Sequence, residues 1–207
     1  YSMGVDTGRE LHVVILRRAG EDVTSRRELI HLAVCHEFGE LDGLLQRFQV
    51  ERCVIDGLPE THATREFAPR HRGQVFMNFF NEHQRGGPKW DREHQIVQVN
   101  RTEALDASRS AVRDRQLVLP PRSPLIEEFA AHMASDAKVL EEDEETGVKK
   151  YRYIKTGTNH FSLAFTYAWL GSSGRQKIEF AFLELPRDPE LDEWRRMLNP
   201  RMSDFFW

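Results

Sequence analysis

Residues 3–12 read Met-Gly-Val-Asp-Thr-Gly-Arg-Glu-Leu-His, and they combine a strand, an acid and a turn. Residues 3–6 form a short apolar strand that ends at Asp6. The Thr-Gly pair that follows favours a turn, and residues 10–17 return as a second strand rich in β-branched side chains. Because residues 27–35 read as a third strand, the segment predicts the start of an antiparallel meander.

A second acid follows a short apolar strand further along the chain. Residues 52–55 are apolar after the first position, and Asp56 and Gly57 come directly after them. A continuous apolar run of this kind is typical of a central parallel strand that is buried on both faces. Apolar residues recur at helical spacing over residues 38–48, which places a helix before this strand.

Further helices and strands alternate along the rest of the chain, which predicts an α/β fold. The expected helices cover residues 59–69, 102–115, 124–133 and 160–170, and the expected strands cover residues 74–79 and 95–99. The polar, glycine-rich residues 81–93 are expected to form a loop. Residues 138–142 and 148–154 flank a glycine-containing turn at 144–147, which predicts a β-hairpin.

Length and composition fit a globular domain. The 207 residues suit one α/β domain, and no apolar run approaches the roughly 20 residues that span a bilayer. Cys35 and Cys53 lie in apolar stretches, so they read as buried thiols and not as a zinc site or a disulfide framework. The net charge of −4 lacks the basic excess that is typical of nucleic-acid-binding domains, although arginines cluster at 65–72, 85–92 and 109–115.

The two acids at strand ends are the main candidates for chemistry. If their strands are neighbours, Asp6 and Asp56 face each other at about 5 Å, the spacing of strands in a sheet. Two carboxylates at that distance repel each other, so they need a cation or a shared proton between them. Hard oxygen ligands select Mg²⁺ or Mn²⁺, and a pair of such ions can hydrolyse a phosphodiester. Aspartate is also common in turns after strands, so the pattern alone fits two turn-forming residues as well.

A third candidate group precedes the apolar helix at 160–170. Asn159 fits an N-cap residue, and it also offers an amide oxygen to a metal. His160 stands at the first turn of the helix, where a neutral imidazole could bind a metal. The sequence does not choose between these roles.

The order of these features resembles the C-terminal nuclease domain of phage terminase large subunits, which has a ribonuclease H-like fold. The resemblance covers residues 3–170. It rests on five features in order, namely the opening strand and turn, the acid in Val54-Ile55-Asp56, the helix start at Asn100-Arg101-Thr102-Glu103, the Leu119-Pro120-Pro121 break, and Asn159-His160 before the Ala-Phe-Thr-Tyr-Ala of residues 164–168.

The resemblance implies a mixed five-stranded sheet flanked by helices, with an added β-hairpin. It implies a ribonuclease H-like nuclease domain over residues 1–170 and a C-terminal extension over residues 171–207. It also implies an endonuclease that uses two Mg²⁺ or Mn²⁺ ions to cut double-stranded DNA concatemers during viral genome packaging. Asp6 and Asp56 match the first two acidic positions of that family. The third acid is replaced by Asn159, so this residue or His160 would complete the site.

The resemblance further implies partners in the host cell cytoplasm and no membrane. An ATPase domain is expected outside this chain, because no Gly-x-x-x-x-Gly-Lys-Ser/Thr phosphate loop occurs in it. A portal, a small terminase subunit and double-stranded DNA are expected as well. Arg65, Arg101 and Lys155 are candidates for phosphate contacts, and the hairpin is a candidate guide for the duplex.

Two alternative functions remain open. A transposase or a Holliday-junction resolvase could open with the same strand and acid. A catalytically inactive ribonuclease H-like module that only binds DNA would be compatible with an amide at position 159.

Overall fold

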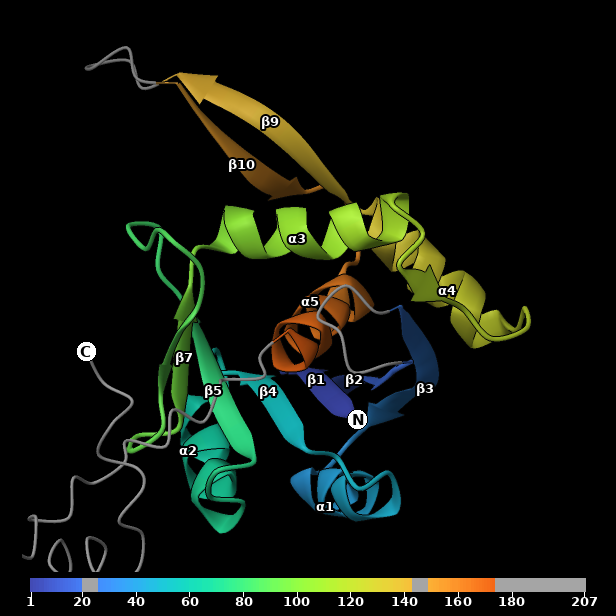
Figure 1. The fold of residues 1–207 in the computed structure, drawn as a ribbon, viewed down its shortest axis with the longest axis vertical. Helices are drawn as coiled ribbons and strands as arrows, with labels where there is room; N and C mark the ends of the chain where they lie inside the picture. Colours follow the sequence, from blue (N-terminus) through green and yellow to red (C-terminus); the bar gives the residue numbers. More distant parts are fainter. Residues whose placement is uncertain (20–25, 143–148, 174–207) are drawn as a thin grey trace, which may run out of the picture. The chain divides into compact units, whose positions relative to one another are not determined.

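The computed structural model describes residues 1–19, 26–142 and 149–173, and within them the main feature is an eight-stranded mixed sheet (Figure 1). Its strands follow the order β6-β7-β5-β4-β1-β2-β3-β8. The expected turn at 144–147 lies outside the described residues. So does the expected C-terminal extension after residue 173, and the last helix of the described residues ends at Ser172.

The five central strands match the sheet expected from the sequence. The meander of the first three strands is antiparallel, β4 pairs in parallel with β1, and β5 pairs in parallel with β4. These strands are β1 (Ser2–Asp6), β2 (Leu11–Arg18), β3 (Arg27–Cys35), β4 (Arg52–Asp56) and β5 (Val75–Phe80).

Three shorter strands widen this sheet. The expected strand β7 (Ile96–Val99) is parallel to β5, and β6 (Lys89–Asp91) is antiparallel to β7 at the edge. The expectation of an unbroken loop over 81–93 was therefore wrong. An edge strand exposes its polar side chains to water, so β6 lacks the apolar pattern of a core strand. At the other edge, β8 (Leu117–Val118) pairs with the start of β3.

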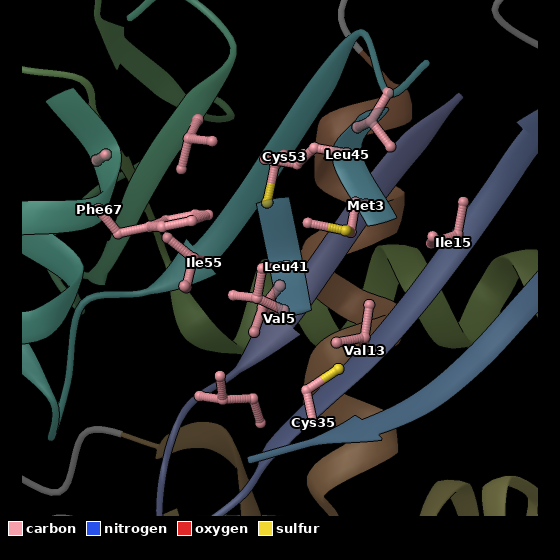
Figure 2. Close-up of a cluster of buried hydrophobic side chains, with 14 of the residues drawn as sticks. Met3, Val5, Val13, Ile15, Cys35, Leu41, Leu45, Cys53, Ile55 and Phe67 are labelled. Atoms are coloured by element: carbon pink, nitrogen blue, oxygen red, sulfur yellow. The ribbon is translucent and has the colours of Figure 1, made fainter. Parts of the chain in front are cut away.

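Helices cover both faces of the sheet (Figure 1). The helices α1 (Phe38–Arg47) and α2 (Thr61–Arg70) cover one face. Figure 2 shows the core cluster on that face, formed by Met3, Val5, Val13, Ile15, Cys35, Leu41, Leu45, Cys53, Ile55 and Phe67. Both cysteines are buried free thiols, as expected.

The other face packs against α5 (His160–Ser172), which lies over β1, β2 and β4. Helices α3 (Arg101–Arg113) and α4 (Pro124–Ala134) pack against α5. Nearly every residue of α5 is buried, which agrees with a sequence that is apolar on all sides of the helix.

The expected hairpin is present as β9 (Asp136–Glu142) and β10 (Lys149–Lys155). It forms a sheet of its own that packs on α3, where the Tyr153 hydroxyl donates to Asp106 at 2.8 Å and Arg101 donates to the Tyr153 carbonyl. Among the described residues, no helix has the length and apolar character needed to cross a membrane.

Candidate active site at the carboxyl ends of β1 and β4

The structure brings Asp6 and Asp56 side by side. Val5 lies opposite Ile55 in the parallel register of β1 and β4, so the two acids occupy the next position on neighbouring strands, and they are close enough for the charge of Asp6 to raise the pKa of Asp56. Both side chains face α5, because Asp6 contacts His160 and Asp56 interacts with Tyr167 on that helix. The predicted carboxylate pair is therefore a feature of the fold.

Asp56 is held by the turn that follows its strand. Its Oδ1 accepts a hydrogen bond from the Leu58 N–H at 3.2 Å, and the Thr7 hydroxyl donates to the Leu58 carbonyl at 3.0 Å. Burial raises the pKa of Asp56 to about 6, and the charge of Asp6 adds to this increase. Burial therefore makes the ionised form of Asp56 unfavourable near neutral pH, and a cation beside the carboxylate would stabilise that form.

Asp6 is paired with a histidine. The His160 Nδ1 lies 2.8 Å from Asp6 Oδ2, and Asp6 is only 4% exposed. Burial raises the pKa of Asp6, whereas the hydrogen bond and charge of His160 and the charge of Lys155 lower it. Asp6 therefore occupies Nδ1 of His160, which leaves Nε2 as the ring nitrogen that could bind a metal.

Asn159 is directed toward a different carboxylate. Its Nδ2 donates to Asp136 Oδ1 at 2.6 Å. The side chain of Asp136 is fully buried and also accepts hydrogen bonds from Arg109 at 2.6 Å and Ser162 at 2.9 Å. Asn159 stands at the N-cap position of α5 but makes no capping hydrogen bond with its side chain. Only its amide oxygen remains as a potential metal ligand.

Replacement of Asn159 by aspartate is expected to destabilise the protein. The substitution puts a carboxylate where the amide now donates to Asp136, in a place where Asn159 is 2% exposed. Two facing buried carboxylates repel each other, and Arg109 is already paired with Asp136. We therefore expect the free energy of unfolding to fall by about 1–3 kcal/mol. Denaturant titration at neutral pH measures it. Asn159→Asp combined with Asp136→Asn restores a carboxylate–amide pair and is expected to recover part of the loss. A single variant as stable as the wild type would contradict the expected repulsion.

Several polar residues around the acids were missed by the sequence reasoning. His12 stacks on His160 with ring centroids 4.6 Å apart, and burial lowers its pKa to about 4. His132 accepts a hydrogen bond from the Phe161 N–H at 3.2 Å and so caps the first turn of α5 from a neighbouring helix. Asn78 and Tyr167 lie near Asp56. The signal for Asn78 was present, because it is the only polar residue in the apolar run of β5.

A divalent cation fits part of this site. Asp6 and Asp56 are two adjoining carboxylates whose pKa values are raised by burial, and such oxygen pairs favour a hard cation. The described residues contain no group of three or more His, Cys, Asp or Glu side chains placed to hold an ion. The two acids therefore suit one ion whose other ligands come from water, substrate or an amide.

Comparison with known proteins adds a likeness of fold. No protein-family model matches the sequence, and no curated protein matches it. The crystal structure of the large terminase nuclease from the thermophilic phage G20c is similar, with a TM-score of 0.52 and 11% identity over 82% of this chain and 80% of that chain. Another structure of that nuclease, with bound magnesium, gives a TM-score of 0.43 and 9% identity over 79% of this chain and 87% of that chain.

The chain therefore has the ribonuclease H-like fold of a phage large terminase nuclease.

Proposed function

We propose that this chain is a divalent-metal-dependent endonuclease that cuts double-stranded DNA concatemers during viral genome packaging. The observation that carries the proposal is the pair Asp6 and Asp56, adjacent at the carboxyl ends of two parallel strands, in a fold shared with a large terminase nuclease. Ligand sites of open α/β sheets gather beyond this end of the strands.

Asp6 and Asp56 would hold Mg²⁺ or Mn²⁺ through their carboxylate oxygens. Such an ion activates a water molecule and neutralises charge on a phosphodiester. His160 fixes the orientation of the Asp6 carboxylate through its 2.8 Å contact. A second ion, as the resemblance implies, would depend on the Asn159 amide oxygen or His160 Nε2 together with oxygens of the substrate.

Double-stranded DNA is the proposed substrate, and three basic side chains are candidates for contacts with its phosphates. Lys155 ends β10, is exposed, and acts electrostatically on Asp6, so we assign it a phosphate contact. Arg65 is exposed on α2, and Arg101 lies at the start of α3. Because the net charge is −4, an ATPase domain, a portal or a small terminase subunit in the host cell cytoplasm would supply further contacts to the DNA.

The test is cleavage of supercoiled plasmid by the purified chain. Nicked and linear products are expected with Mg²⁺ or Mn²⁺ and not with excess chelator, and restoring the ion should restore cleavage. Cutting that persists in chelator would contradict the proposal. A matched pair of linear and four-way-junction substrates separates a packaging nuclease from a resolvase, which would prefer the junction.

One observation favours a second candidate, a DNA-binding module without catalysis. The chain has Asn159 where the resemblance implies an acid, and no group of three or more His, Cys, Asp or Glu side chains that could hold an ion occurs in the described part of the chain. DNA binding without cleavage at any concentration of Mn²⁺ would support this candidate.

A further inference from the structure

Two buried polar side chains border Asp56 without hydrogen-bond partners. Both the Nδ2 and the Oδ1 of Asn78 are unpaired among the described residues, and so is the hydroxyl of Tyr167. Both residues are 0% exposed. A buried polar group without a partner costs about 1–3 kcal/mol, so these groups weaken the fold instead of stabilising it. Stability therefore does not explain why Asn78 and Tyr167 carry these polar groups, and a functional role would explain them.

The register places Asn78 in one row with the two acids. Asn78 lies opposite Asp56 in the parallel pairing of β4 and β5, and paired residues point to the same face of a sheet. The preceding pair on that face, Val54 and Phe76, belongs to the core cluster that contains Tyr167. The row therefore runs from Asp6 through Asp56 to Asn78, beneath α5.

Tyr167 is fixed above this row. Its ring stacks on Phe80 with centroids 5.8 Å apart, and its hydroxyl makes no hydrogen bond of normal length, yet it is close enough to Asp56 to lower the pKa of that carboxyl. The Leu58 N–H already holds Oδ1 of Asp56. Oδ2 is thus the oxygen left for Tyr167.

We propose that Tyr167 and Asn78 are positioning residues that orient the Asp56 carboxylate for a divalent cation. In this arrangement the Tyr167 hydroxyl donates to Oδ2 of Asp56, and the Asn78 amide donates to the Tyr167 oxygen. Neither residue touches the cation. The inference rests on the proposed function, because it takes Asp56 to be a metal ligand. Partners that orient metal ligands in this way change metal affinity by about tenfold or more when they are removed.

The experiment compares two nearly isosteric variants of the full chain, Tyr167→Phe and Asn78→Leu. Mn²⁺ affinity is measured from the electron paramagnetic resonance signal of the free ion. We expect about tenfold weaker binding in each variant. Because one hydrogen-bonded chain is broken in either case, the double variant should bind no more weakly than the worse single variant. Thermal melting in chelator checks that each variant keeps its fold, so that weaker Mn²⁺ binding is not read from an unfolded protein.

Ser2→Ala is the matched control. The Ser2 hydroxyl is also buried and has no hydrogen-bond partner in the described part of the chain, but it lies at the opposite end of β1 from Asp6. Loss of the Ser2 hydroxyl should leave Mn²⁺ affinity unchanged.

Equal Mn²⁺ affinity in wild type, Tyr167→Phe and Asn78→Leu would overturn the positioning role and leave the proposed function intact. A wild-type chain that binds no Mn²⁺ would overturn the proposed function and this inference with it. If Asn78→Leu does not fold, Tyr167→Phe alone decides the outcome.

Discussion

Replacement of Asp56 by asparagine is expected to abolish DNA cleavage and, in the same protein, to raise the stability of the metal-free fold. Cleavage depends on the charge that Asp56 would bring to a divalent cation, and such a cation contributes several kcal/mol to the transition state. A loss of about a thousandfold or more in rate is therefore expected, since each 1.36 kcal/mol corresponds to a factor of ten. A single-turnover cleavage assay in Mn²⁺ measures it.

The gain in stability follows from the direction of the pKa shift. The pKa of Asp56 rises from 3.8 to about 6 on folding, chiefly through burial. A carboxyl group with a raised pKa favours the folded state fully below its ordinary pKa, and this contribution is lost as the pH rises through about 6. Asparagine has no charge to desolvate. The variant should thus match the wild type near pH ~4 and exceed it by about 1–3 kcal/mol near pH ~8, as measured by denaturant titration in chelator.

Two further variants complete this prediction. Asp6→Asn should also abolish cleavage, but it gives up the contact with His160 and should not gain the same stability. Asp42→Asn is the matched control, because Asp42 lies on α1, across the sheet from the acids, and is paired with Arg70 and His71. It should cleave as the wild type does. Full activity in Asp56→Asn would remove the acid pair from the proposed mechanism.

The central sheet and the acid pair were accessible from the sequence because their signals are local. A buried strand shows its apolar run, and an acid directly after it sits at the end of the strand whatever the rest of the fold does. Asp6 and Asp56 each carry this signal. Their proximity also required β1 and β4 to be neighbours, which the sequence alone left as a condition and the register shows.

The partners of the site residues were not accessible in this way. Asn159 donates to Asp136, which lies 23 positions earlier in the chain, and the sequence gives no reason to prefer that carboxylate over Asp6. The contact depends on how the start of β9 packs beside α5. Likewise Tyr167 reads as one more apolar position of a buried helix, and its approach to Asp56 depends on the position of α5 over the sheet.

The position of α5 over the sheet leads to the prediction with the largest effect on stability. Replacement of Gly4 by alanine is expected to destabilise the fold strongly. Gly4 lies in the middle of β1, at a point where the backbone of α5 lies directly against the strand. An added Cβ atom would lie 2.0 Å from the Ala164 carbonyl oxygen and 2.2 Å from the Ala168 nitrogen. Both are backbone atoms, so no change of side-chain rotamer can relieve the overlap.

Relief of that overlap requires the whole helix to move away from the sheet. Phe161 and Phe165 on α5 are 0% exposed, so the movement would open the core on this face. We expect a cost of about 4 kcal/mol or more, which belongs to the most severe single substitutions and is a large part of the 5–15 kcal/mol that stabilises a typical domain. Thermal and denaturant unfolding measure the loss, with a fall in melting temperature of roughly 10 °C or more.

Gly43→Ala shows whether the effect belongs to the helix contact or to glycine replacement in general. Gly43 lies within α1, and an added Cβ atom there would meet nothing within 4 Å. Alanine favours a helix over glycine by about 0.5–1 kcal/mol, so this variant should be slightly more stable than the wild type. Gly4→Ala should also weaken Mn²⁺ binding, because a displaced α5 carries His160 and Tyr167 away from the acids. A Gly4→Ala protein with wild-type stability would mean that α5 does not lie against β1, and the arrangement of the acid row beneath the helix would fail with it.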